Sequence, residues 1–361
     1  MRIALLFVLC FVSSSVLPQK PDWNRVDQQV NQIPASAEKS IPALALWIKI
    51  SFTTQPDRIR AIQRWIALNL KYDFTTPLSV ITQKENPEII AAAFKTRKAV
   101  CGGYAGLMDS VCKLMNIKSF VIDGYTIQDE KINPNAHAWV AALIDEKWYL
   151  FDPTWSSGSL VNGQYEHEFD ESYFMVKPEK MIETHIPFDP IWQFQDFPVM
   201  SRSNGNTQQK TFYNFEDSIQ DYFQLPDKQK ITKEIDRINQ TQSRNQAVVR
   251  RLSFLYSNLD VEIYNENVSL YNESIKLYND AVNKWDDYIG FRNKHLDDIQ
   301  AVKKKSPKLD EVLQELEKAN HKLKQMKELP SDMSAGVFEL RDAIRTMQSQ
   351  VQGEKKLMKT K

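Results

Sequence analysis

Cysteine is scarce in this 361-residue chain, and no long hydrophobic run follows the N-terminal segment. The only three cysteines are Cys10, Cys101 and Cys112. Because no later stretch is apolar enough to cross a bilayer, we expect no transmembrane segment beyond the N-terminus. Lysine plus arginine equals aspartate plus glutamate, at 46 residues each, so the net charge is zero. This balance gives no overall attraction to nucleic acid or to an anionic membrane surface, and we expect neither as a partner.

The first 18 residues have the pattern of a secretory signal peptide. Arg2 precedes the apolar run Ile3–Val12, and Ser13–Ser15 follows it. That run is shorter than the roughly 20 residues that a membrane-spanning helix needs. We therefore predict that residues 1–18 are removed, with Cys10 among them, and that the mature protein is exported to the periplasm, the cell envelope or the medium.

Apolar residues recur at helical spacing between Cys101 and Asn116, which predicts a helix that begins at or just after Cys101. Cys112 would lie on the same helix, about 16 Å from Cys101. A disulfide tolerates only about 7 Å between Cα atoms, so the two thiols cannot pair. We interpret Cys112 as a small core residue. Cys101 would face unpaired backbone amides and the positive end of the helix dipole, which favour a thiolate.

A hairpin follows this helix in the sequence. Residues 119–125, 136–144 and 147–152 are predicted strands, and a tight turn joins the last two. His137 begins one arm of the hairpin and Asp152 ends the other. Antiparallel pairing brings these two positions to the same open end of the hairpin, with a register offset of about two residues.

A nucleophile, a base and an orienting carboxylate are therefore expected at one site. Cys101 would attack a carbonyl, His137 would remove and return the proton, and Asp152 would hold the imidazole in place. Taken alone, a cysteine, histidine or aspartate in such a position more often has a structural role than a catalytic one. A cysteine at a helix start, with a histidine and an aspartate on paired strands, favours a catalytic triad for acyl transfer through a thioester.

Three motifs carry a resemblance to a known family: Ala-Val-Cys-Gly-Gly-Tyr-Ala at 99–105, His-Ala-Trp-Val at 137–140, and Trp-Tyr-Leu-Phe-Asp-Pro-Thr-Trp at 148–155. They resemble the transglutaminase-like superfamily of papain-type cysteine enzymes, in particular its kyphoscoliosis-peptidase-like and bacterial transglutaminase-like group. The resemblance extends from about Ile59 to Trp192. It implies an α+β papain-like core, in which a cysteine-bearing helix packs on an antiparallel sheet, and the same three roles for Cys101, His137 and Asp152.

The animal cross-linking enzymes of this superfamily use calcium. The sequence has no loop of the Asp-x-Asp-x-Asp-Gly kind that binds calcium. We therefore expect no metal and no other cofactor.

Four residues are candidates for the wall of a substrate groove: Tyr72, Gly102, Trp139 and Trp155. Tyr72 is either a second oxyanion donor beside the Cys101 backbone N–H or a packed core tyrosine. The two tryptophans flank the predicted partners of the cysteine, although core packing explains them equally well.

Six of the ten glycines lie between Gly102 and Gly163, a concentration typical of loop-rich parts where sites are built. The polar segments 128–135 and 156–168 are predicted loops, and the second would line the groove. We interpret His167 and His185 as ordinary surface or turn residues.

The composition changes to a polar linker near residues 200–209, and a mostly helical region follows. We predict an N-terminal helical arm and catalytic domain over residues 19–200 and a helical bundle or coiled coil over 201–361. A seven-residue repeat supports the bundle. Its members are Val261, Val268, Ile275, Val282 and Ile289, with Tyr264, Tyr271, Tyr278 and Trp285 three positions later.

These patterns leave more than one function open. The first is an exported cysteine enzyme whose acyl-enzyme is resolved by water, as in a protease or amidase, or by an amine, as in a transglutaminase. We favour water, and a protein or peptide as the substrate. The second is a non-catalytic scaffold of the cell envelope that keeps the fold and binds a protein partner through its C-terminal helices. A third is an envelope factor that acts on peptide cross-links or on a surface partner.

Overall fold

The computed structural model describes residues 22–75, 86–201, 207–208, 212–241 and 243–360. The predicted signal peptide lies outside these residues. The chain divides into two compact units. The first is Met1–Ile219 with Thr241–Val248, and the second is Gln220–Gln240 with Val249–Lys361. The domain boundary that we expect after residue 200 stays a prediction.

Local sequence sets where the helices of the first unit begin. Helix α1 (Trp23–Val30) is capped by Asp22, and α2 (Ile41–Ser51), α3 (Gln55–Asn69) and α4 (Pro87–Thr96) each follow a capping Ser, Thr or Asn. The last three also carry proline in their first turn, where its missing N–H costs no hydrogen bond. These helices form one side of the core of this unit.

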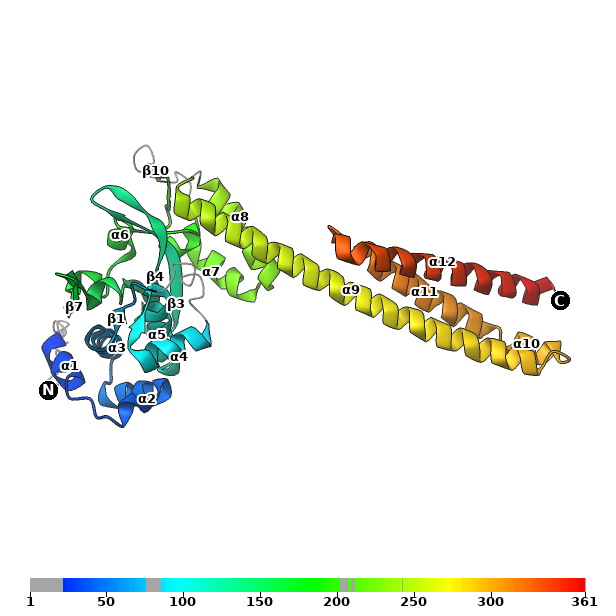
Figure 1. Ribbon diagram of the computed structural model, residues 1–361, viewed down its shortest axis with the longest axis horizontal. Coiled ribbons are helices and arrows are strands. Elements are labelled where there is room, and N and C mark those ends of the chain that lie inside the picture. The colour runs from blue at the N-terminus through cyan, green and yellow to red at the C-terminus, as the bar shows by residue number, and fades with distance from the viewer. Residues whose placement is uncertain (1–21, 76–85, 202–206, 209–211, 242, 361) are drawn as a thin grey trace, which may run out of the picture. The chain divides into compact units, whose positions relative to one another are not determined.

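A four-stranded antiparallel sheet forms the other side, in the order β5-β4-β3-β8 (Figure 1). Its strands are β3 (Ser119–Gln128), β4 (Lys131–Ile144), β5 (Lys147–Phe151) and β8 (His185–Pro187). The prediction of a loop at 128–135 is wrong. Strands β3 and β4 extend into it, because Asp129 and Glu130 adopt positive φ and close a two-residue turn.

Edge strand β8 lies very close to β3. A Cβ at Gly124 would lie 2.0 Å from the carbonyl oxygen of Ile186 and 2.6 Å from the Trp139 ring. Glycine is therefore required at this position, and it allows β8 to pair with Gly124, Tyr125 and Thr126.

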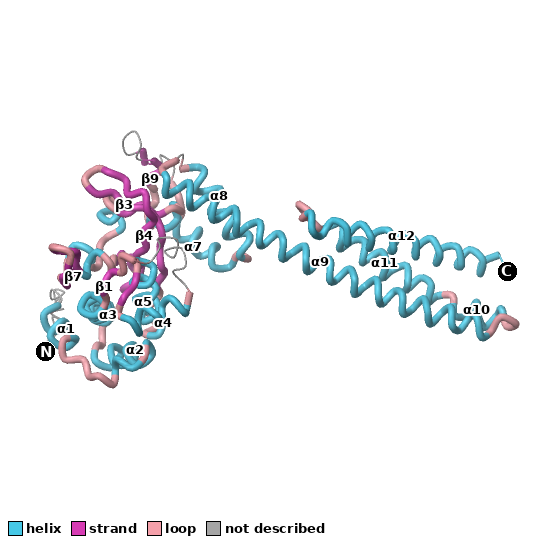
Figure 2. Tube along the Cα trace, viewed as in Figure 1, coloured by secondary structure: helices cyan, strands magenta, loops and turns pink. Residues whose placement is uncertain are grey.

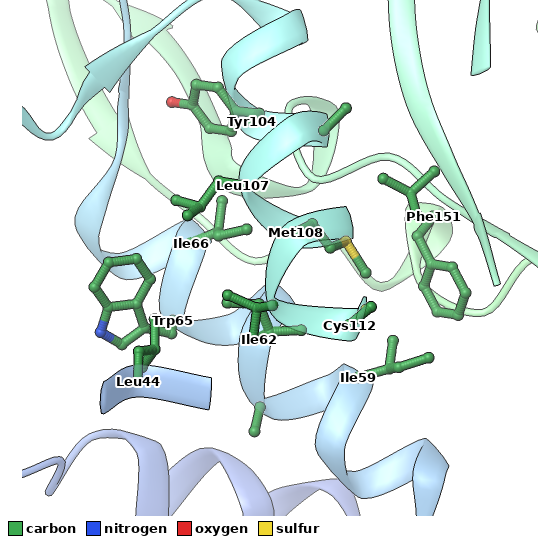
Figure 3. Close-up of a cluster of buried hydrophobic side chains, with 14 of the residues drawn as sticks. Leu44, Ile59, Ile62, Trp65, Ile66, Tyr104, Leu107, Met108, Cys112 and Phe151 are labelled. Atoms are coloured by element: carbon green, nitrogen blue, oxygen red, sulfur yellow. The ribbon is translucent and has the colours of Figure 1, made fainter. Parts of the chain in front are cut away.

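Helix α5 (Cys101–Leu114) lies at the centre of the first unit. Its apolar stripe packs on α2, α3 and the sheet, as Figure 3 shows. Leu107, Met108 and Cys112 are 0% exposed and contribute to one continuous apolar cluster with Trp65 and Phe151. The interpretation of Cys112 as a core residue is therefore confirmed.

Short elements complete this unit. Strands β1 (Lys71–Tyr72) and β2 (Lys98–Ala99) pair in parallel, and β9 (Val199–Ser201) pairs with β10 (Thr207–Gln208). The predicted loop at 156–168 contains a hairpin, β6 (Gly158–Val161) with β7 (Gln164–His167). The remaining short helices are η1 (Ala37–Lys39), η3 (Trp155–Ser157), η4 (Glu171–Tyr173), α6 (Pro178–Met181) and η5 (Pro190–Gln193).

Helices make up the second unit (Figure 2). They are α8 (Asp227–Gln240), α9 (Gln246–Lys294), α10 (Ile299–Lys305), α11 (Pro307–Gln325) and α12 (Ser331–Thr360). Helix α7 (Phe215–Gln224) and helix α9 each have residues in both units. No described helix has the length and apolar character needed to cross a membrane.

The predicted heptad residues are buried only in part. Val261 and Tyr264 are 56% and 39% exposed, whereas Tyr271, Tyr278 and Trp285 pack against the apolar cluster formed with α11 and α12. The aromatic column therefore packs as expected in its later heptads and not in its first.

Candidate active site

The first functional group stands at the start of helix α5. Cys101 is the first residue of α5, and its N-cap residue Val100 makes no side-chain capping bond. The first N–H groups of a helix have no partner within it, so the amides of Cys101 and Gly102 are suited to receive a developing oxyanion. Cys101 itself is only 1% exposed.

A parallel strand pair brings Tyr72 to this cysteine. Tyr72 pairs with Ala99, two residues before Cys101, and the N–H of Asp73 donates to the carbonyl of Ala99 at 2.9 Å. Burial raises the pKa of Tyr72, and the charges of Cys101, Asp152 and Asp73 raise it further. The phenol therefore keeps its proton at neutral pH and can act as a donor.

The hairpin β4–β5 joins the histidine to the carboxylate. Val140 pairs with Phe151, so the register places Asp152 opposite Trp139, two positions from His137. The predicted offset of two is confirmed. His137 Nε2 nevertheless lies 2.7 Å from Asp152 Oδ2, within hydrogen-bond distance.

The His137 imidazole is held in its charged form. Burial alone would lower its pKa, but the charge and hydrogen bond of Asp152, with a side-chain hydrogen bond and charge from Cys101, raise the pKa to about 10. Because Nε2 is bound to Asp152, Nδ1 is the ring nitrogen left for Cys101. The structure thus brings Cys101, His137 and Asp152 together.

Asp152 is buried, at 0% exposure, and both of its carboxylate oxygens are bonded. Oδ1 accepts the backbone N–H groups of Thr154 at 2.8 Å and Trp155 at 3.0 Å. Oδ2 accepts from His137, and from His185 at 3.0 Å. Burial alone would raise the Asp152 pKa, but these histidine interactions lower it, so the group stays ionised.

His185 is therefore a residue that the sequence interpretation missed. It is 1% exposed and bonded to Asp152, and not an ordinary surface or turn residue. Strand β8 has three residues and no alternating pattern, so its pairing with β3 gave no signal in the sequence. The apolar neighbours Ile186 and Phe188 were the only hint of burial. His167, by contrast, is exposed on β7.

A cavity of about 440 Å³ opens beside His137. Two of the predicted groove residues, Tyr72 and Trp155, line it, whereas Gly102 and Trp139 are buried and lie outside its lining. The hairpin β6–β7, the segment before η4 and η4 itself supply the other wall. Lining residues from these segments are Gly158, Ser159, Tyr165, Asp170 and Tyr173.

Three ligand atoms of His137, Asp152 and His185 lie within 4.8 Å of one another, which is close enough to consider a metal. Two ligands of a tetrahedral zinc ion at about 2.0 Å would lie about 3.3 Å apart. The observed N···O distances of 2.7 and 3.0 Å are shorter and are those of hydrogen bonds. We therefore assign no metal to these atoms, and the expectation that no cofactor is needed stays a prediction.

The fold and the site together define a class: an α+β domain that presents a cysteine at a helix start to a histidine–aspartate pair on a sheet. Residues 47–153 match the family model of the transglutaminase-like superfamily, so this part of the chain is a transglutaminase-like domain.

Named relatives match part of the chain. A human protein named kyphoscoliosis peptidase is 30% identical over 171 residues, which cover 45% of this chain and 25% of that protein. A Caenorhabditis elegans protein named Lim and transglutaminase domain protein ltd-1 is 29% identical over 163 residues, which cover 40% and 22%. The chain thus spans about a quarter of the length of these curated relatives.

A solved structure of the periplasmic domain of TgpA from Pseudomonas aeruginosa is also similar. It is 23% identical, with a TM-score of 0.26, and the match covers 36% of this chain and 47% of that chain.

Proposed function

We propose that this protein is a cysteine-dependent acyl-transfer enzyme that acts on proteins or peptides. One observation carries the proposal. The buried His137 imidazole is bonded to Asp152 on one side, is in hydrogen-bond contact with Cys101 on the other, and lies at the wall of a cavity. Members of the transglutaminase-like superfamily are typically cysteine enzymes, which agrees with this assignment.

The chemistry follows from the positions of these groups. The Cys101 sulfur attacks the substrate carbonyl carbon, and the amides at the start of α5 stabilise the oxyanion. The C–N bond breaks as His137 gives its proton to the leaving amine. Water then attacks the thioester while His137 takes its proton, and the C–S bond breaks to release the acid and the sulfur while His137 keeps that proton for the next cycle.

We propose water as the acceptor, although an amine would complete the same cycle by aminolysis. The test is to incubate the full chain with a casein-like protein and a labelled primary amine, and to use Cys101→Ala as the control. Peptide fragments without label, absent in the control, are the expected result. Label incorporation without fragments would contradict hydrolysis and favour cross-linking.

A scaffold role is the second candidate, and the 1% exposure of Cys101 favours it. A substrate carbonyl reaches this sulfur only after part of the site moves, because Cys101 is not among the residues that line the cavity. Iodoacetamide at neutral pH distinguishes the two functions. Fast alkylation of Cys101 supports the enzyme, whereas equally slow alkylation of Cys101 and Cys112 supports the scaffold.

The cavity also indicates which substrates are accepted. Aromatic rings and uncharged polar groups form most of its lining. Among the described lining residues, Asp170 is the one acidic residue, and there is no lysine or arginine and no basic group apart from the reacting His137. The charge of Asp170 is felt at Tyr173, whose pKa is raised by burial and by this carboxylate. We infer that a basic side chain beside the reacting carbonyl of the substrate is preferred over an acidic one.

Asp170→Asn tests this preference, because the amide oxygen can still accept from the N–H of Ser172 as the carboxylate does. We expect the ratio of kcat/KM for a lysine-containing peptide to that for its glutamate counterpart to fall by up to about fivefold, the effect of a solvent-connected ion pair. Asp145→Asn, at the β4–β5 turn, is the matched control and should leave the ratio unchanged. An equal ratio in all three proteins would contradict the preference.

Export through residues 1–18 is likewise our proposal, since it rests on the sequence of that segment alone. Cell fractionation with and without residues 1–18 tests it. Retention of both forms in the cytoplasm would overturn it. Binding of a protein partner through the C-terminal helices stays a prediction.

A further inference from the structure

The buried histidine His185 has no role in the chemistry described so far. It lies on edge strand β8, is 1% exposed, and packs its ring edge-on against Trp139 and Trp155, at centroid distances of 5.1 and 4.7 Å. Its register explains why it reaches the site. His185 pairs with Thr126 of β3, and His137 pairs with Gly124 on the other side of the same strand. Positions two apart on a strand share a face, so both imidazoles project from the same face of the sheet.

The hydrogen bonds of His185 define its tautomer. Nε2 lies 3.0 Å from Asp152 Oδ2, and an ionised carboxylate can only accept, so Nε2 carries the proton. Nδ1 lies 2.8 Å from the hydroxyl of Thr184 and accepts from it. Burial, with the neighbouring charge of His137, outweighs Asp152 and lowers the pKa of His185. His185 is therefore a neutral donor at neutral pH.

This donor completes the set of bonds around Asp152. An ionised carboxylate offers about four acceptor positions, and Asp152 has four donors: two backbone N–H groups on Oδ1 and two imidazoles on Oδ2. The two imidazoles share one oxygen. A second donor on that oxygen draws off electron density that would otherwise strengthen the bond to His137.

We propose that His185 is a positioning residue that fixes the Asp152 carboxylate and limits how strongly it holds the proton of His137. The inference rests on the proposed chemistry of Cys101 and His137. Without the His185 donor, Asp152 becomes more basic and holds the imidazolium more tightly. His137 would then give its proton less readily to the leaving amine, as each cycle requires, and would lose it to solvent only at higher pH.

Among the described residues, the titratable groups that act on this pair belong to the proposed site. Asp152 follows β5, His137 is on β4, and Tyr173 ends η4, with its ring 6.0 Å from that of His185. Cys101 of α5 acts on His137, and the charge of Asp152 also reaches Tyr72 of β1. These groups are unchanged in the variants below, so a shift in proton release reports on His185.

Two substitutions separate the donor from the ring. His185→Phe keeps a ring for packing against the tryptophans and removes the donor. His185→Gln places an amide N–H the same number of bonds from Cβ and restores it. His321→Phe, at an exposed position of α11, is the matched control. Thermal unfolding of each variant checks that it folds.

The readout is the pH dependence of Cys101 alkylation by iodoacetamide in the full chain, followed by peptide mass spectrometry between pH 6 and 11. In wild type, the inflection that marks loss of the His137 proton is expected near its pKa of about 10. His185→Phe should move it upward by about one pH unit, a tenfold change in proton affinity. His185→Gln and His321→Phe should leave it near the wild-type position. An unmoved inflection in a folded His185→Phe variant would overturn the inference.

A direct measurement covers the case in which His185→Phe does not fold. Long-range proton–nitrogen NMR correlations of histidine-labelled wild-type protein should show His185 as the Nε2–H tautomer, neutral at pH 7. A charged ring or an Nδ1–H tautomer contradicts the proposal. Failure of this inference is distinct from failure of the proposed function: the latter would show as slow wild-type alkylation of Cys101, at the rate of Cys112.

Discussion

The two ends of helix α5 place identical thiols in opposite surroundings. Cys101 begins the helix, beside unpaired amides, the His137 imidazole and the Tyr72 phenol. Cys112 lies in the apolar cluster of Figure 3, where burial raises the pKa of its thiol and keeps it protonated. Both thiols are buried and share one helix, so the difference in their surroundings comes from the groups that the rest of the fold brings to each.

The largest expected effect separates these two ends directly. Cys101→Ala should abolish turnover, by more than about a thousandfold, because no other group forms the thioester. Cys112→Ala should retain turnover and Cys101 alkylation. Fragment release from a casein-like protein and mass spectrometry of alkylated peptides measure both. Activity that survived in Cys101→Ala would remove the contrast between the two thiols.

The second-largest effect tests His137, the partner of Cys101. His137→Ala should lower turnover by about a hundredfold to ten-thousandfold, the usual range for loss of a general base. It should also slow iodoacetamide alkylation of Cys101 while that of Cys112 remains slow. Stopped-time labelling at pH 7 gives both rates in one sample. Unchanged labelling of Cys101 would show that His137 does not activate it.

The third effect is a pH dependence of stability that belongs to the Cys101 end. Because the pKa of His137 is raised, its contribution to the free energy of unfolding is complete below the ordinary histidine pKa of 6.5. That contribution is lost as the pH rises toward about 10. The lowered pKa of Asp152 means that its contribution is complete above 3.8 and is lost in acid. Urea unfolding should therefore give a lower free energy of unfolding at pH 9.5 than at pH 6.

His137→Gln is the control for this dependence, and it should flatten the decline between those two pH values. Cys112→Ala should leave the decline intact. A decline of equal size in His137→Gln would assign the pH dependence to other groups.

The fourth effect concerns the backbone in the first turn of α5, beside Cys101. A Cβ at Gly103 would lie 2.7 Å from the Cβ of Ala99 and 3.3 Å from that of Ala93. Glycine to alanine within a helix is usually stabilising, but here the contact should displace the first turn. We expect Gly103→Ala to slow Cys101 alkylation by about tenfold, since small misplacements of reacting groups have large effects. Ser110→Ala, on the same helix, should leave the rate unchanged, and a similar rate in both variants would argue against the displacement.

The smallest effect concerns Cys112, at the other end of α5. Cys112→Ala should lower the free energy of unfolding by about 1 kcal/mol, because it leaves a small cavity among apolar neighbours. For a unit of this size the melting temperature should fall by about 2–4 °C. Differential scanning calorimetry measures this shift. A fall as large as that expected for breaking a buried ion pair would mean that Cys112 has more than a packing role.

Local pattern was enough to predict much of the site. The apolar spacing after Cys101 placed the start of α5, and the turn at Asp145-Glu146 set the register that brings His137 to Asp152. The pattern failed where pairing is long-range. His185 reaches the site through a three-residue strand whose partner lies about sixty residues earlier in the sequence, and Tyr72 reaches it through a two-residue strand.

The shape of the cavity wall and the exposure of individual side chains also could not be predicted from the sequence. The cavity wall combines Tyr72 and Trp155 with Tyr165, from a segment that the sequence indicated only as polar, and with Asp170, which lies beyond that segment. Trp139 was expected at the groove and is 0% exposed. In the helical unit, the heptad repeat begins at Val261. This residue is nevertheless 56% exposed, because the apolar cluster with α11 and α12 forms further along α9.

The sequence by itself determined the helix that carries Cys101, the hairpin that joins His137 to Asp152, and the apolar core around Cys112. Capping residues, helical periodicity and a tight turn act over a few residues, so they can be identified in a single chain. Only the tertiary structure decided that a second imidazole bonds Asp152 and that Tyr72 lies beside the thiol. Those contacts depend on strand pairing between distant segments, which no local pattern specifies.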